Sequence, residues 1–252
     1  MIHFVGAGCG AADLITLRGH RFVEAADVII YAGSLVNPEI LEYAKSDCEI
    51  HNSAYMTLDE VVDVMKKAES QDKMTVRLHT GDPSIYGAIR EQMDALDKLG
   101  IEYDVCPGVS SFCGAAAALK AEYTLPEVSQ TVILTRMAGR TPVPEKESIP
   151  LLASHHATMA IFLSVGSVRE LSQQLIEGGY SHNTPAAVVY KASWKDEKVC
   201  RCTVGTLEET VKTNNITKTA LITVGDFLGD DYALSKLYDP NFETEYRKAA
   251  DK

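Results

Sequence analysis

The sequence has no apolar run that approaches the roughly 20 residues of a membrane-spanning helix. Its start, MIHFVGAGCG, lacks the basic residues and apolar stretch of a secretory signal, so we expect a cytoplasmic protein without membrane contact. Basic residues are in deficit, since 24 Lys and Arg face 35 Asp and Glu and the formal net charge is -11. Nucleic-acid binders normally carry a basic excess, so we expect no nucleic-acid partner; an anionic small substrate is still compatible with a local basic pocket.

Clustered metal ligands and local catalytic triads are also missing. The six cysteines are scattered, and the close pair Cys200 and Cys202 is C-x-C without a second pair at zinc spacing. We therefore expect reduced cysteines and no protein-bound metal. No stretch has the local context of a Ser-His-Asp or Cys-His triad, and the adjacent His155 and His156 are expected at the surface.

Short apolar runs alternate with helical patterns through the first half of the chain. Thr57 and Glu60 have capping-box spacing, Thr16 and Asn37 are N-cap candidates, and Gly100 is placed to end a helix. This alternation predicts a mostly parallel sheet covered on both faces. The expected strands are 2–6, 27–33, 74–79 and 101–108, and the expected helices are 16–26, 37–45, 57–69, 83–100 and 110–121.

The second half differs because strands 185–193 and 198–205 follow each other without a helix between them, which indicates a mixed sheet. The stretch YTLPEVSQ, residues 123–130, has the composition of a linker. We therefore predict two α/β domains, residues 1–124 and 125–252, with a ligand cleft between them. The other expected elements are strands 131–136, 158–165 and 219–228 and helices 168–179 and 206–214.

The glycine turn GAGCG lies between a predicted strand and a predicted helix, as a dinucleotide site requires. However, Gly6, Gly8 and Gly10 are spaced G-x-G-x-G, and the second strand ends in Tyr31-Ala32-Gly33 without an acid for a ribose hydroxyl. The evidence for a nicotinamide oxidoreductase is therefore weak. A tight strand-to-helix turn explains the glycines as well as a dinucleotide site does.

The corner Gly81-Asp82-Pro83 stands where a strand is predicted to enter a helix. A carboxylate here disfavours phosphate and suits a ligand that carries an ammonium or a sulfonium; the alternative is that Asp82 caps the helix. The turn PGVSSF offers Ser110 and Ser111 either as caps of the next helix or as ligand contacts at the carboxyl end of the sheet.

The loop RMAGRTPVPE places Arg136 and Arg140 around a glycine between prolines. Two guanidiniums on a stiff loop suit carboxylate recognition, and the alternative is a solvated linker. Lys191 and Lys195 in YKASWKDE are interpreted as ordinary surface residues.

Several of these motifs together resemble the tetrapyrrole methyltransferases, which use S-adenosylmethionine. YAGSLV with RMAGRTPVPE is similar to the members that methylate C11 of precorrin-4 or cobalt-precorrin-4 in cobalamin biosynthesis. One departure is Cys9, where many relatives have proline. The resemblance covers nearly the whole chain and rests on VGAGCGAADLITLRG, VIIYAGSLV, RLHTGDPSIYGAIREQ, CPGVSSFCGAAAAL, TPAAVVYKASWKDE and TALITVGDFL.

The resemblance implies a homodimer of two-domain subunits, with S-adenosylmethionine in the cleft between the domains and S-adenosylhomocysteine as product. The candidate catalytic residues are Asp13 and Asp82, and no protein-bound metal is implied. The implied cofactor contacts are Thr80, Gly81, Asp82, Pro83, Ile85, Ser110, Ser111, Leu163, Ala187 and Ala220. The implied contacts to the tetrapyrrole substrate are Gly8, Gly10, Asp13, Ser34, Arg136 and Arg140.

Three alternatives stay open beside this reading. The chain could methylate another tetrapyrrole position, or a related methylase could act on RNA or protein, although the acidic balance disfavours RNA. A non-catalytic ligand-binding module is the third, because in-line methyl transfer needs no diagnostic nucleophile. The residues do not distinguish a substrate with cobalt from one without it.

Overall fold

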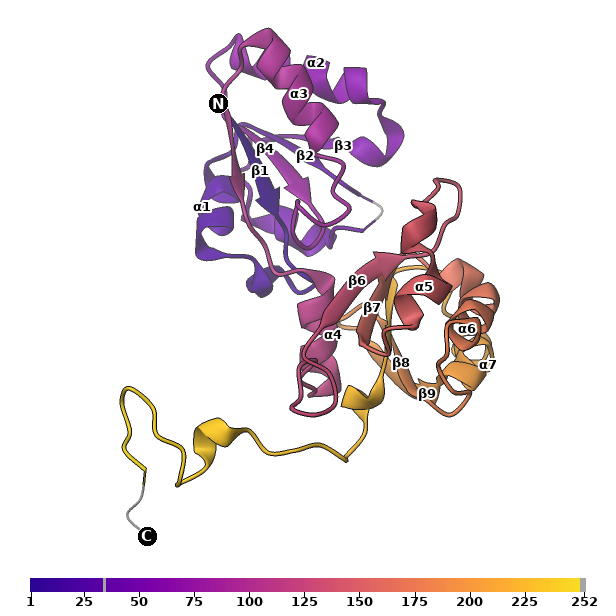
Figure 1. The fold of residues 1–252 in the computed structure, drawn as a ribbon. Helices are drawn as coiled ribbons and strands as arrows, with labels where there is room; N and C mark the ends of the chain where they lie inside the picture. Colours follow the sequence, from indigo (N-terminus) through magenta and orange to yellow (C-terminus); the bar gives the residue numbers. More distant parts are fainter. Residues whose placement is uncertain (34, 250–252) are drawn as a thin grey trace. The chain divides into compact units, whose positions relative to one another are not determined.

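The computed structural model describes residues 1–33 and 35–249, which form two compact units (Figure 1). Unit 1 consists of residues 1–115 together with 191–197, and unit 2 consists of residues 116–190 together with the chain from 198 onward. Each unit contains a five-stranded sheet. Within the described ranges, no helix is both long enough and apolar enough to cross a membrane.

The sheet of unit 1 is parallel throughout, in the order β3-β2-β4-β1-β5. Its central strands are buried on both faces, as parallel sheets require, and Figure 1 shows α2 and α3 together over one face with α1 on the other. The strands are β1 (Ile2–Gly6), β2 (Val28–Tyr31), β3 (Glu49–Asn52), β4 (Thr75–His79) and β5 (Tyr103–Cys106), and the helices are α1 (Leu17–Ala25), α2 (Leu58–Glu69), α3 (Arg90–Leu99) and α4 (Ser111–Leu119), the last of which continues into unit 2.

Alternation along the strands divides the core of unit 1 into two layers. Phe4 and Ile30 pack with Met65 of α2, whereas Val5 and Ile29 belong to the layer on the α1 side. Because all strands are parallel, their carboxyl ends meet at one edge, which is where ligands bind in such sheets.

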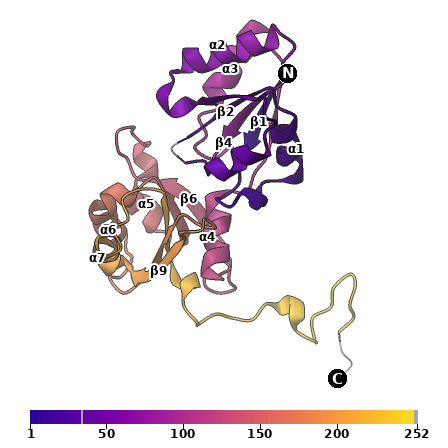
Figure 2. The same cartoon turned by 180° about the vertical axis from the view of Figure 1, so that it is seen from behind.

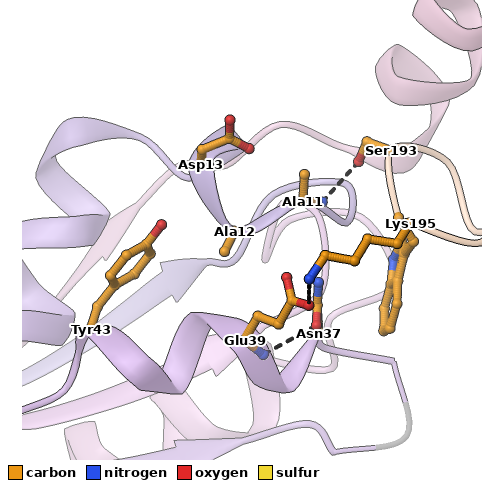
Figure 3. Close-up of a pocket in the computed structure, with 9 residues that line it drawn as sticks. Ala11, Ala12, Asp13, Asn37, Glu39, Tyr43, Ser193 and Lys195 are labelled. Atoms are coloured by element: carbon orange, nitrogen blue, oxygen red, sulfur yellow. Dashed lines mark hydrogen bonds and ion pairs between the residues drawn. The ribbon is translucent and has the colours of Figure 1, made fainter.

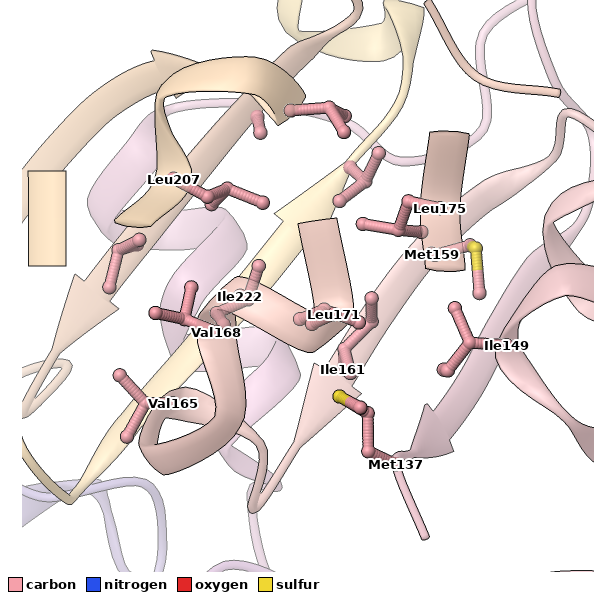
Figure 4. Close-up of a cluster of buried hydrophobic side chains, with 14 of the residues drawn as sticks. Met137, Ile149, Met159, Ile161, Val165, Val168, Leu171, Leu175, Leu207 and Ile222 are labelled. Carbon is pink, nitrogen blue, oxygen red and sulfur yellow. The ribbon is translucent and has the colours of Figure 1, made fainter. Parts of the chain in front are cut away.

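The sheet of unit 2 is mixed, in the order β6-β7-β10-β8-β9. Strands β6 and β7 pair in parallel, and the other neighbours are antiparallel. Figure 4 shows the core that this sheet shares with α5, α6 and α7, built around side chains such as Ile161, Leu171 and Leu207. The elements are β6 (Val132–Arg136), α5 (Ile149–Ala153), β7 (Thr158–Phe162), α6 (Val168–Glu177), β8 (Pro185–Tyr190), β9 (Lys198–Thr203), α7 (Leu207–Thr213) and β10 (Ala220–Val224).

Short 3₁₀ turns connect many of these elements. After β10 the chain has no further α-helix or strand up to residue 249, as the reverse view in Figure 2 shows. The 3₁₀ turns are Ala12–Leu14, Pro38–Tyr43, Ser53–Tyr55, Glu145–Glu147, Val165–Ser167, Val204–Thr206, Asp226–Leu228 and Lys236–Tyr238.

The predicted α/β class, with a parallel sheet followed by a mixed sheet, is confirmed, but several local predictions are wrong or incomplete. The helix expected over 83–100 begins only at Arg90. Tyr86 and Ala88 have φ of 55° and 50°, which a right-handed helix excludes. The segment 37–45 forms a 3₁₀ turn, and the strand expected over 185–193 ends at Tyr190. The polar edge strand β3 and the short helix α5 were not predicted.

Candidate functional site

Three glycines bring the carboxyl ends of β1, β4 and β5 into backbone contact. A Cβ on Gly6 would lie 2.6 Å from the Cα of Gly108 and 2.6 Å from the carbonyl oxygen of Gly81. Gly8 and Gly81, with φ of 82° and 63°, exchange N–H···O bonds of 3.3 and 2.9 Å. The glycine turn therefore packs against the turn after β4; this close approach accounts for Gly6, and the positive φ accounts for Gly8.

Asp82 ties the turn after β4 to the turn after β5. Its Oδ1 accepts hydrogen bonds from the Ser84 N–H at 2.9 Å and from the Ser84 hydroxyl, and its Oδ2 accepts the Gly108 N–H at 2.8 Å. Partial burial raises the pKa of Asp82, but these hydrogen bonds outweigh it, so the pKa lies below its ordinary value. The alternative that Asp82 caps a helix is excluded, because α3 does not begin until Arg90.

Two polar atoms beside this turn are buried without a hydrogen-bond partner in residues 1–33 and 35–249: Oγ1 of Thr80 and Nε2 of His79. Burial, helped by the charge of Arg77, lowers the pKa of His79 to about 3, so its ring is neutral. Buried polar atoms are nearly always satisfied in proteins. The Thr80 hydroxyl therefore fits a site in which a polar atom of a ligand completes the bonding, as expected of a cofactor contact.

The structure brings most of the predicted unit 1 cofactor residues together. Ser110 Cα and Ser111 N lie 3.4 Å from where a Cβ of Gly81 would stand, so the two turns face each other closely. Ile85 N donates to the Asp82 carbonyl at 3.2 Å, which places Pro83 and Ile85 in the loop that follows.

An open pocket of ≈ 300 Å³ lies beside residues 11–13, which follow the glycine turn (Figure 3). Asp13 lines this pocket, as expected of a substrate-side residue. Gly10 lies next to the pocket, because its carbonyl accepts a hydrogen bond at 3.1 Å from Nδ2 of the lining residue Asn37. The lining residues are Ala11, Ala12, Asp13, Asn37, Glu39, Tyr43, Ser193, Trp194 and Lys195.

Sequence reasoning missed the part of this pocket that comes from residues 193–195. Lys195 is a surface residue, as interpreted, with its side chain 84% exposed, and its Nζ lies 2.5 Å from Glu39 Oε1 at the rim of the pocket. Ser193 Oγ accepts the N–H of Ala11 at 2.9 Å, and Trp194 forms part of the wall. A lone tryptophan in a polar loop was the available signal, since it is the only one in the chain.

The two arginines of the proline-rich loop have different surroundings. Arg136 Nη1 donates to the carbonyls of Met137 and Thr141 at 3.0 and 3.1 Å, and its Nη2 donates to that of Pro142 at 2.8 Å. Arg136 therefore braces its own loop, whereas Arg140 is exposed. The predicted substrate contact Ser34 lies outside the described residues.

In unit 2, Leu163 and Ala220 lie at the same end of the sheet, because β7 and β10 are antiparallel and these residues follow one strand and begin the other. Leu163 is 65% exposed and has φ of 51°. An exposed apolar side chain on strained backbone is typical of functional sites. Ala187 is instead fully buried in the middle of β8, opposite Thr223.

Comparison with known proteins gives concordant matches. The profile of the family Tetrapyrrole (Corrin/Porphyrin) Methylases matches residues 1–208. The chain is 60% identical, over 97% of its length and 95% of the relative's, to a cobalt-precorrin-4 C(11)-methyltransferase of Methanocaldococcus jannaschii. It is 42% identical, over 98% of each chain, to a precorrin-4 C(11)-methyltransferase of a Sinorhizobium species. The solved structure of the cobalt precorrin-4 methyltransferase CbiF is similar at 45% identity, with a TM-score of 0.89 over 91% of this chain and 96% of that chain.

Proposed function

The chain belongs to the tetrapyrrole (corrin/porphyrin) methylases, and from this membership we propose that it methylates C11 of precorrin-4 or cobalt-precorrin-4 in cobalamin biosynthesis. The observation that carries the proposal is the 60% identity, over nearly the full length, to a cobalt-precorrin-4 C(11)-methyltransferase. The identity to the precorrin-4 enzyme of Sinorhizobium is lower, at 42%, which favours the cobalt form of the substrate.

We propose that the turn Thr80–Asp82, with Ser110 and Ser111, holds the methyl donor. The unpartnered hydroxyl of Thr80 supports this assignment, and so does the carboxylate of Asp82, whose negative charge suits a sulfonium. When bound, S-adenosylmethionine supplies an electrophilic methyl group and leaves as S-adenosylhomocysteine. Pro83, Ile85, Leu163 and Ala220 complete the proposed contact set, whereas Ala187, predicted as a further contact, is fully buried within β8 and is not included.

The chain's own residues need only bind and orient the two reactants, because alignment alone is worth about 7–11 kcal/mol in favourable cases. Asp82 already accepts three hydrogen bonds from its own turn and the next, so we assign it a binding role. Asp13 lines the open pocket and is the better candidate to take a proton from the macrocycle.

On the acceptor side we propose Gly8, Gly10, Asp13, Ser34, Arg136 and Arg140 as contacts to the tetrapyrrole. Arg140 is the exposed guanidinium of its loop, and Arg136 supports the loop that carries it. We further propose that the domains are residues 1–124 and 125–252 and that the protein is a cytoplasmic homodimer, as the family resemblance implies. Light scattering of the purified protein tests the dimer.

The first experiment is calorimetric titration with S-adenosylhomocysteine, with NAD titrated in parallel. Binding of the nucleoside without binding of NAD is expected, and NAD binding alone would favour the oxidoreductase. Turnover is then measured as transfer of a labelled methyl group from S-adenosylmethionine to cobalt-precorrin-4 and to precorrin-4. Binding without transfer to either would identify a ligand-binding module.

A matched pair of variants locates the donor site. Thr80→Val replaces the buried hydroxyl with a methyl of similar volume and is expected to weaken S-adenosylhomocysteine binding several-fold. Thr75→Val makes the same change at a second buried and unpartnered threonine, within β4, and is expected to leave binding unchanged. Equal effects of the two variants would contradict the assignment of Thr80.

A further inference from the structure

Residues 191–197, which we call the strap, follow β8 and pack on the glycine loop, residues 8–13. A Cβ on Gly10 would lie 2.3 Å from both the carbonyl oxygen of Ala192 and Cδ1 of Trp194, so the backbones are in direct contact. Lys191 and Ser193 have φ of 47° and 65°, values that side-chain-bearing residues rarely adopt. The strap therefore keeps a strained conformation, which persists only where the surroundings impose it.

Ser193 makes the central contact between the strap and the loop. Its Oγ accepts the Ala11 N–H at 2.9 Å and lies 3.5 Å from Cys9 Sγ. The N–H of Ser193 donates to Glu197 Oε2 at 2.5 Å, which fixes the turn that aims the hydroxyl. One hydroxyl thus sets the orientation of the peptide that joins Gly10 to Ala11.

The 3₁₀ turn Pro38–Tyr43 and its cap also contact this region. Asn37 Nδ2 donates to the Gly10 carbonyl, which belongs to the same peptide. Figure 3 shows that Lys195 of the strap pairs with Glu39 of this turn. Ser193 and Lys195 of the strap therefore contact residues that line the same pocket as Asp13.

We propose that Ser193 is a positioning residue, whose hydroxyl oxygen holds the glycine loop in the conformation that presents Gly10 and Asp13 to the tetrapyrrole. This inference rests on the proposed function, because it assumes that the methyl acceptor is a tetrapyrrole. It does not involve the binding of the methyl donor. Ser193 acts through its hydrogen bond to Ala11, so its removal is expected to change the handling of the acceptor while donor binding stays intact.

The test compares Ser193→Ala with Ser129→Ala. Ser129 is a matched control, since its Oγ also accepts a backbone N–H distant in sequence, that of Thr158 at 3.1 Å, but in unit 2. Ser193→Ala is expected to lower kcat/KM for the tetrapyrrole about tenfold, the effect of one lost hydrogen bond, while S-adenosylhomocysteine affinity stays within about twofold. Amide hydrogen exchange of residues 8–13 is expected to accelerate in Ser193→Ala and not in Ser129→Ala.

A second variant removes the other partner of the bond. Ala11→Pro deletes the N–H, and the φ of Ala11, −61°, is the value that proline imposes. If the bond carries the effect, the double variant is no more impaired than the worse single variant. The proposal would be overturned if the losses of kcat/KM in the two single variants added up in the double variant. It would also be overturned if amide exchange of the loop became faster while kcat/KM for the tetrapyrrole stayed unchanged. A wild-type protein that transfers no methyl group would instead refute the proposed function, and the exchange data would still report on the Ser193 contact.

Discussion

Gln92 of α3 joins strand β4 to the loop that carries the proposed cofactor contacts. Its Oε1 accepts from Arg77 Nε at 2.9 Å, and its Nε2 donates to the Ala88 carbonyl at 2.9 Å. Arg77 is 6% exposed and Gln92 5% exposed. Burial lowers the pKa of Arg77 to about 10, and its Nη1 donates to the Ile30 carbonyl at 3.1 Å. The guanidinium is thus a buried cation that depends on neutral acceptors.

Replacing Gln92 with methionine keeps the side-chain length and removes both bonds. A hydrogen bond to a charged group is worth about 1.5–3 kcal/mol and a neutral one about 0.5–1.5 kcal/mol. Water can replace the donor at the exposed Ala88, so we expect a loss of about 2–4 kcal/mol in the free energy of unfolding. Gln92→Glu keeps the acceptor for Arg77 and loses the donor to Ala88, and its added charge pairs with the guanidinium. Because that ion pair offsets the cost of burying the carboxylate, a net loss of about 1 kcal/mol is expected.

Urea denaturation followed by circular dichroism measures both variants. Gln173→Met, the same replacement at an exposed position of α6, is the control and is expected to change stability by less than about 0.5 kcal/mol. Gln92→Glu is also expected to weaken S-adenosylhomocysteine binding, because the loop after β4 loses its anchor. Equal losses of stability in Gln92→Met and Gln92→Glu would refute the argument that Arg77 makes the dominant contact.

Three further predictions concern the same region and the acceptor. Asp82→Asn is expected to lose about 1 kcal/mol by weakening the bond from Gly108. The pKa of Asp82 is lowered in the folded protein, so the stability difference between wild type and Asp82→Asn is complete above about pH 4. The difference disappears as the pH falls through that lowered pKa. Urea denaturation at several pH values measures it, and a difference that does not change with pH would refute the reasoning. Gly6→Ala is expected to lose about 3 kcal/mol or more, because its Cβ meets backbone atoms, whereas Gly166→Ala, with open space, is nearly neutral in the same denaturation assay. Arg140→Ala is expected to raise KM for the tetrapyrrole several-fold; an unchanged KM would remove Arg140 from the acceptor site.

Local signals in the sequence identified much of the fold. Thr16 and Thr57 cap their helices as predicted, and the Thr57–Glu60 capping box is complete. Gly100 ends α3 with φ of 66°. These features depend on neighbours within a few residues, so the sequence pattern contains the information needed to predict them.

Features set by distant contacts could not be predicted in this way. The segment 83–89 was predicted as the start of a helix because Pro83 suits a first helical turn, yet Tyr86 and Ala88 adopt positive φ, and Gly87, where a Cβ would lie 2.1 Å from the Pro83 carbonyl oxygen, was the signal that was missed. The bond between Ser193 and Ala11 joins residues 182 positions apart, and no local pattern in the sequence reports such a pairing. The candidate cofactor turns were therefore predictable from their motifs, whereas the strap was not.

The composition of unit 1 also bears on how the chain folds during synthesis. Residues 1–115 leave the ribosome first, but the strap follows only after the 75 residues 116–190 have been translated. At about 5–20 residues per second this takes roughly 4–15 seconds, during which the glycine loop lacks Ser193 and Lys195. The loop therefore acquires its final support late, so a fragment truncated before residue 191 is expected to retain the parallel sheet while its glycine loop stays open to proteases.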